Sequence, residues 1–103
     1  MSSARSGRRA ALARITIASL FIPAQVADHM WEKHRIDDVQ VLSLPSRFHV
    51  VIRNHGRAPY RLIGRDDQGR CIAAPIHPTD DWLTWRVASA WYCDQDEANR
   101  LRP

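Results

Sequence analysis

Three histidines stand where an imidazole could transfer protons during cleavage of a phosphodiester. His34 follows Lys33 near the end of a predicted helix, His77 comes just after a predicted strand, and His29 precedes Lys33 by one helical turn. RNA can be cleaved by its own 2′-hydroxyl if one group removes that proton and another protonates the leaving 5′-oxygen. Histidine suits both tasks because its ordinary pKa is about 6.5. We therefore rank His34 first, His77 second and His29 third as proton-transfer candidates.

Arginine is the residue type that could hold the phosphate. All but one of the 15 basic residues are arginines, and Lys33 is the exception. The flat guanidinium suits bidentate contacts with phosphate better than an ammonium does. Alternation along a predicted strand at 60–65 places two arginines on one face, and a third lies in a later strand. The predicted phosphate ligands are Arg61, Arg65 and Arg86, and Lys33, beside His34, is a further candidate for catalysis. The aromatic residues that could stack an RNA base are Tyr60 and Trp91.

Each candidate also has a purely structural explanation. His34 could bond a carbonyl at the helix end, and His77, before Pro78, could lie in a loop. Arg61 and Arg65 could solvate an exposed sheet face or pair with neighbouring acids. The tryptophans that could belong to the core instead are Trp82, Trp85 and Trp91. The histidines without a metal-ligand partner at suitable spacing are His29, His49 and His55, so no metal and no cofactor are predicted.

Composition limits the class of protein. The chain has 103 residues and a formal net charge of +4, which favours one domain and an anionic partner. Residues 1–14 are predicted to be a flexible basic tail, and residues 15–103 a single domain. Cys71 and Cys93 are too few and too far apart for a disulfide framework or zinc cluster, so we interpret them as thiols in a reducing compartment. Since no run approaches the roughly 18 apolar residues of a membrane span, we expect a cytoplasmic protein without a membrane partner.

A strand and one or two helices are predicted ahead of most of the sheet. Residues 15–22 are rich in β-branched and apolar side chains, which is typical of a strand. Residues 24–35 place apolar side chains at helical spacing on one side. Asp37 could cap a second short helix through Leu44, although 39–42 could equally be a strand, and Pro45 ends either one.

The C-terminal half predicts the rest of the sheet. Strand patterns lie at 48–53, 60–65, 72–76 and 83–91. The last of these has one heavy apolar face, expected to pack on the helices: Leu83, Trp85, Val87, Ser89 and Trp91. Asp94 and Glu97 resemble a capping box that begins a final helix. The predicted class is α+β, with a small antiparallel sheet of four to five strands, an N-terminal helix or helices packed on one face and a short C-terminal helix. We expect the arginines of the sheet to face the basic helix.

Several short segments of the chain resemble the BrnT-type toxins of bacterial type II toxin–antitoxin pairs, in the RelE/ParE-like superfamily. The segments are Glu32-Lys33-His34, the strand from Tyr60 to Gly64 with Arg65, the Gly69-Arg70 turn, the apolar strand after it, and Arg86-Val87-Ala88-Ser89-Ala90. The resemblance covers roughly residues 15–101. Two positions depart from the family pattern. Arg35 stands where glycine is usual, and Trp91 replaces a usual arginine, which removes a basic group from the presumed active face.

The resemblance implies a RelE-like toxin domain over residues 15–103 that acts as a metal-independent endoribonuclease on mRNA. A cognate antitoxin would neutralise it, often one with a ribbon-helix-helix DNA-binding domain, so operator DNA would be contacted only through the antitoxin. The Trp91 departure favours an alternative, a catalytically inactive RelE-like module that binds RNA, an antitoxin or another partner protein. A third interpretation is an unrelated small α+β interaction protein. Other enzyme classes are disfavoured because no nucleophile–base motif is present.

Overall fold

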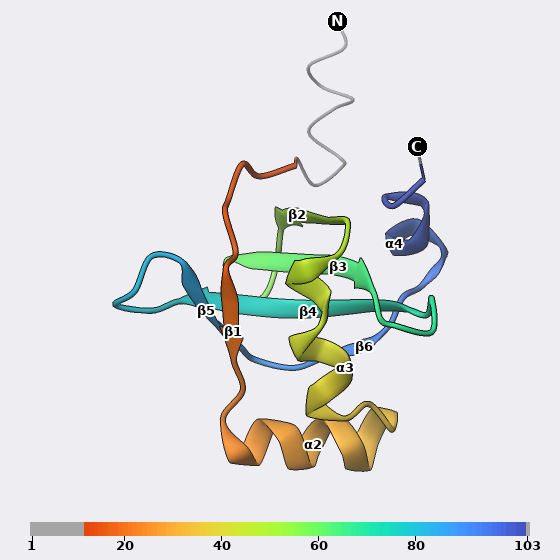
Figure 1. Ribbon diagram of the computed structural model, residues 1–103, viewed down its shortest axis with the longest axis horizontal. Helices are drawn as coiled ribbons and strands as arrows, with labels where there is room; N and C mark the ends of the chain where they lie inside the picture. Colours follow the sequence, from red (N-terminus) through yellow and green to blue (C-terminus); the bar gives the residue numbers. More distant parts are fainter. Residues whose placement is uncertain (1–11, 103) are drawn as a thin grey trace, which may run out of the picture.

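A computed structural model describes residues 12–102, and over this range the chain forms an α+β domain, which confirms the predicted class (Figure 1). The elements are, in order, β1 (Ser19–Phe21), α2 (Ala24–His34), α3 (Asp38–Leu42), the 3-10 helix η1 (Leu44–Ser46), β2 (His49–Arg53), β3 (Tyr60–Arg65), β4 (Cys71–Pro78), β5 (Thr84–Val87), β6 (Trp91–Tyr92) and α4 (Gln95–Asn99). Most of the predicted tail, 1–14, lies outside the described residues.

Within residues 12–102 the sheet has six strands, in the order β1-β5-β4-β3-β2, and β6 also pairs with β4. The prediction of four to five antiparallel strands is wrong, because β1 pairs with β5 in parallel. Most of the predicted strand 15–22 does not pair but runs across the sheet (Figure 1). At its start, the Ala13 amide donates to the Val51 carbonyl of β2 at 2.7 Å. The segment 12–21 therefore reaches from β2 to β5, at opposite sides of the sheet.

Helices α2 and α3 cover one face of the sheet. Met30 of α2 and Val41 of α3 are fully buried and belong to one core cluster with Leu62 of β3. Alternate residues of a strand point to opposite faces, so the neighbours of Leu62, Arg61 and Ile63, point away from these helices. Ile63 belongs to a second, smaller cluster on that other face. The expectation that the arginines face the basic helix is therefore wrong.

Two short helices begin with reciprocal capping boxes. The Asp37 side chain accepts from the Gln40 amide at 2.8 Å, and Gln40 Oε1 accepts from the Asp37 amide at 2.9 Å. The predicted second helix is therefore present, and the alternative strand at 39–42 is wrong. However, α3 ends at Leu42 rather than Leu44, and Pro45 lies inside η1 instead of ending the helix. Asp94 and Glu97 make the same pair of bonds at the start of α4, at 2.8 and 2.9 Å, as predicted. In both cases the box satisfies backbone donors that a helix start leaves unpaired.

Opposite Pro75 of β4, the partner strand bulges. Ile76 pairs with Val87 on β5, whereas Ala73 pairs with Trp91 on β6, so two residues of β4 face the three residues 88–90. Pro75 has no N–H to donate to a ladder, which makes a bulge the favoured solution. One extra residue reverses the alternation of faces. The predicted strand 83–91 is therefore two strands, and Trp91 lies on the face opposite the helices rather than against them.

Cys71 and Cys93 form a disulfide, which corrects the interpretation of two separate thiols. Ile72 pairs with Tyr92 in the β4–β6 ladder, so the next residues outward are Cys71 and Cys93. Their Cα atoms are 5.3 Å apart, although 22 positions separate them in sequence. Strand pairing, which the spacing of two cysteines does not reveal, is the reason that they meet.

Arg35 ends α2 in the left-handed conformation, with φ 56° and ψ 38°. Its amide donates to the Trp31 carbonyl at 3.0 Å, which is the single 5→1 bond of the αL motif, and the Ile36 amide donates to the Met30 carbonyl at 3.3 Å. This position favours glycine because a Cβ costs about 1–2 kcal/mol there. The glycine that the resemblance leads one to expect at this position thus has a physical reason.

We predict that the Arg35→Gly variant is more stable than the Arg35→Ala variant by about 1 kcal/mol, since the two differ by the Cβ alone. Both lose the contact of the Arg35 guanidinium with the Trp31 ring, 5.2 Å from its centroid, so that contact cancels in the comparison. Urea denaturation with equal m-values measures the difference. Equal midpoints would show that the backbone conformation here carries no strain.

Candidate nucleic-acid interface

The sheet face opposite α2 and α3, here called the arginine face, bears three predicted phosphate ligands: Arg61, Arg65 and Arg86. Arg86 stands opposite His77 in the β4–β5 pair. Residues directly opposite each other on one sheet face have Cβ atoms about 5 Å apart. Leu101, which follows α4, packs with Ile63 in the cluster of this face. Because Ile63 lies between Arg61 and Arg65 on β3, this contact divides the face into two regions.

A hollow of about 420 Å³, here called the His77 pocket, lies on the arginine face beside the loop that joins β2 to β3. The residues that line it are Asn54, Gly56, Arg57, Ala58, Arg61, Pro75, His77, Ala88 and Trp91. The fold therefore brings together Arg61, His77 and Trp91, which were predicted as site residues from the sequence. Arg86 lies next to them, across the β4–β5 ladder from His77.

Arg61 is held in place by its neighbours. Its Nε and Nη2 donate to Asn54 Oδ1 at 3.0 and 2.6 Å, and its Nη1 donates to Glu97 Oε2 at 2.9 Å. The guanidinium also lies 5.5 Å from the centroid of the Trp91 ring. A guanidinium paired with a carboxylate that is 5% exposed has much of its charge compensated. Arg61 is therefore better placed to fix the wall of the pocket than to receive a phosphate.

Glu97 connects Trp91 to this arrangement. The Trp91 indole N–H donates to both carboxylate oxygens of Glu97, at 3.1 and 3.2 Å, and Glu97 is buried. Glu97 was recognised in the sequence only as a helix-capping residue. Its hydrogen bonds with Trp91 and Arg61 were not predicted. Arg57 was missed because it lies in a loop, where strand alternation gives no signal. Its side chain lines the pocket and is exposed.

His77 is partly buried at the end of β4, and burial together with the positive charge of Arg86 lowers its pKa below the ordinary value of 6.5. Both causes disfavour the imidazolium. At neutral pH the ring is therefore uncharged and able to accept a proton, as a general base must. This property favours His77 as a base and disfavours it as an acid.

No protein-family model and no curated protein matches this sequence. Among residues 12–102, no three histidine, cysteine, aspartate or glutamate side chains are grouped so that they could hold a metal ion. None of the helices in that range combines the length and the apolar character needed to cross a membrane.

The remaining candidates lie outside the His77 pocket. Lys33 and His34 belong to α2, on the other side of the sheet, where the His34 ring is 6.2 Å from that of His29. Tyr60 points to the helix-covered face and packs edge-on against Trp85, with ring centroids 5.6 Å apart. The fold thus separates the basic end of α2 from the arginine face. Arg65 lies on that face, at the far end of β3 from Arg61.

The low pKa of His77 leads to a titration prediction. In wild-type protein the ring should titrate with a midpoint below 6.5, and Arg86→Gln should raise that midpoint by removing a nearby positive charge. The midpoint of the Arg86→Gln variant should still lie below 6.5, because the His77 ring remains partly buried. NMR detection of the imidazole signals measures both values. Arg53→Gln, on the helix-covered face beside Tyr60, is the matched control and should leave the midpoint unchanged.

The same shift has a consequence for stability. Because the folded-state pKa of His77 is lower than the unfolded value, the unfolded chain binds this proton more readily as the pH falls below 6.5. The contribution of His77 to stability should therefore be complete above pH 6.5 and decline below it. Substitution with glutamine should remove this slope, measured by urea denaturation across that pH range.

Proposed function

We propose that the chain binds single-stranded RNA on its arginine face and cleaves it in the His77 pocket, as the toxin of a type II toxin–antitoxin pair. The observation that carries this proposal is that His77 and Arg57 line one hollow of about 420 Å³, with Arg86 directly across the β4–β5 ladder from His77. An uncharged imidazole beside two guanidinium groups matches the needs of 2′-hydroxyl attack on a phosphodiester. The resemblance to BrnT-type toxins agrees with this chemistry.

In the proposed reaction, His77 takes the proton of the 2′-hydroxyl, whose oxygen attacks the adjacent phosphorus. The bond from phosphorus to the 5′-oxygen breaks, leaving a cyclic phosphate on one fragment and a 5′-hydroxyl on the other. Arg86 and Arg57 stabilise the negative charge that develops on the phosphoryl oxygens. Among the described lining residues no second titratable acid accompanies His77. Water therefore protonates the 5′-oxygen, because Lys33 and His34 of α2 lie on the other side of the sheet and do not reach it.

The proposed partners follow from the toxin role. A cognate antitoxin, typically with a ribbon-helix-helix domain, would cover the arginine face and bind operator DNA on behalf of the pair. Cleavage of mRNA requires the cytoplasm, where the Cys71–Cys93 pair would be kept reduced as two thiols. The β4–β6 ladder would still hold these two residues side by side.

A second candidate function is a catalytically inactive module that binds RNA or a partner protein. One observation favours it. Arg61 is engaged by Asn54 and Glu97, and Trp91, which stands where the resemblance leads one to expect arginine, is bonded to the same Glu97. Two positions of the presumed active face therefore serve the fold rather than a substrate.

Induction of the chain in bacteria, with and without its neighbouring reading frame, tests the proposal. The toxin role predicts growth arrest that the neighbour relieves, and RNA cleavage by the purified protein in the presence of a chelator. Binding of RNA that weakens steeply with salt, without cleavage, would instead identify the inactive module, because bound phosphates release counterions. A chain that neither binds RNA nor affects growth would be the unrelated interaction protein, and both RNA proposals would fail.

A further inference from the structure

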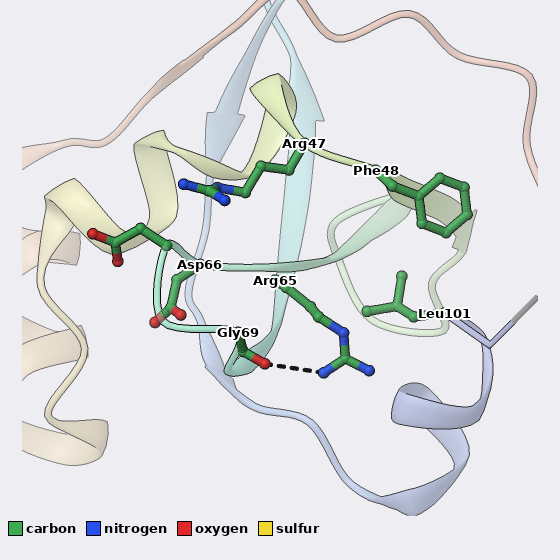
Figure 2. Close-up of a pocket in the computed structure, with 7 residues that line it drawn as sticks. Arg47, Phe48, Arg65, Asp66, Gly69 and Leu101 are labelled. Atoms are coloured by element: carbon green, nitrogen blue, oxygen red, sulfur yellow. Dashed lines mark hydrogen bonds between the residues drawn. The ribbon is translucent and has the colours of Figure 1, made fainter.

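A second hollow, of about 460 Å³, lies at the other end of β3 and is here called the Phe48 pocket (Figure 2). Its lining residues are Arg47, Phe48, Arg65, Asp66, Asp67, Gly69 and Leu101. The volume is within the range of sites for small organic ligands, about 300–1,000 Å³. It joins an apolar part, formed by Phe48 and Leu101, to a basic part formed by two arginines. A ligand with a flat apolar ring and an anionic group fits such a site.

Phe48 supplies an exposed ring at this pocket. The β2–β3 ladder pairs His49 with Gly64, so the next residues outward, Phe48 and Arg65, stand across from each other on the arginine face. The Phe48 side chain is 69% exposed, which leaves its ring surface available to a ligand. Exposed aromatic side chains beside arginines are the usual stacking surface for the bases of single-stranded nucleic acids.

Arg65 supplies an oriented cation. Its Nη1 donates to the Gly69 carbonyl at 3.0 Å, and Figure 2 shows the guanidinium extending below Leu101. Within residues 12–102, neither Arg65 nor Arg47 forms an ion pair. The carboxylate of Asp66 is buried and engaged with Arg70, so it does not compete for Arg65. Asp67 adds a carboxylate to the lining.

From these observations we propose that the Phe48 pocket holds one nucleotide of single-stranded RNA, with its base stacked on Phe48 and its phosphate bound by Arg65. This assignment rests on the proposed RNA binding and adds a subsite distinct from the His77 pocket. Arg61 and Arg65 are four residues apart on one face of β3, a distance of about 13 Å at roughly 3.3 Å per residue. A single RNA strand that passes over Leu101, which packs in the Ile63 cluster between them, can therefore reach both pockets.

Binding of a fluorescent 2′-O-methyl oligoribonucleotide, which has no free 2′-hydroxyl and cannot be cleaved, tests the subsite. Phe48→Ala should weaken binding about 5- to 150-fold at constant salt, the loss expected for one base–aromatic stack. Phe48→Trp should retain the affinity. Trp82→Ala, which removes another exposed aromatic outside both pockets, should leave it unchanged. An abasic oligonucleotide of equal length should bind the wild type and Phe48→Ala equally well, since no base can stack.

The outcomes separate this inference from the proposed function. If the wild-type protein binds the oligonucleotide and Phe48→Ala binds it equally well, the subsite is refuted while RNA binding stands. If Phe48→Ala lowers the affinity for the abasic oligonucleotide as much as the affinity for the complete one, base stacking on Phe48 is refuted. If the wild-type protein binds neither the complete nor the abasic oligonucleotide, the proposed function is refuted, and the proposed subsite is refuted with it. Circular dichroism establishes that each variant is folded, which is expected because the Phe48 side chain is exposed.

Discussion

Replacing His77 by glutamine is expected to lower the rate of RNA cleavage about 10²- to 10⁴-fold, the usual contribution of a general base. Glutamine keeps a polar side chain of similar reach but cannot take the 2′-hydroxyl proton. The residual rate should come from Arg86 and Arg57, which still bind and polarise the phosphate. Cleavage of a labelled oligoribonucleotide under single-turnover conditions measures the change, because product release does not enter that rate.

The pH profile of cleavage distinguishes the loss of the general base from the loss of a phosphate contact. Wild-type activity should rise with pH to a plateau reached near neutrality, since the pKa of His77 lies below 6.5. His77→Gln should lose that rising limb, whereas Arg86→Gln should keep it at reduced rate and move it to higher pH. His49→Gln, on the helix-covered face, is the matched control and should retain both rate and profile. If His34→Gln abolished cleavage while His77→Gln did not, catalysis would belong to α2 instead.

Replacing Asp66 by alanine is expected to destabilise the fold by about 3 kcal/mol. Its carboxylate is buried and accepts from the amides of Gln68 and Arg70, from Arg70 Nε and from Gln40 Nε2, at 2.9 to 3.1 Å. Breaking a buried ion pair costs about 3–5 kcal/mol. We expect the lower end because the Arg70 side chain is 44% exposed and can turn to water. Asp67→Ala, one residue on and exposed, should change stability by less than about 0.5 kcal/mol.

The stabilising effect of the Asp66 carboxylate should depend on pH in the acidic range. Burial raises the pKa of Asp66, but its hydrogen bonds with Arg70, Gln40 and Gln68 together outweigh burial and leave the pKa below 3.8. Its stabilising effect is therefore complete above pH 3.8 and declines as the pH falls through the folded-state value. Denaturation midpoints of wild type and Asp66→Ala should converge in that acidic range. A constant gap down to the lowest pH would show that the charge of Asp66 does not contribute.

The parts of the fold that local patterns determine were predictable. The strand from Tyr60 to Arg65 matches its predicted bounds, because alternation of polar and apolar residues is a local signal. The capping box of Asp94 and Glu97 was predicted for the same reason. Arg61, His77 and Trp91 were also named in advance, and they line one pocket.

The parts that depend on pairing between distant segments were not predictable. The bulge opposite Pro75 moves Trp91 to the arginine face, which reverses the alternation read from residues 83–91. The meeting of Cys71 with Cys93 depends on the same ladder. The prediction of an antiparallel sheet was wrong for β1, because nothing in the sequence of a short apolar strand specifies a parallel neighbour. Glu97 was assigned one role, since its contact with Arg61 joins residues 36 positions apart.

The crossing of segment 12–21 has a consequence for biosynthesis. Ser19 of β1 meets Thr84 of β5, 65 residues later in the chain. At about 5–20 residues per second, translation takes roughly 3–13 s to produce those residues. During that time β1 has no partner strand, and the sheet cannot be completed until β5 has been synthesised. Because β1 has only three residues, it exposes few unpaired backbone groups that could pair wrongly before β5 is made. A nascent chain is therefore expected to acquire its native sheet only after β5 has been synthesised.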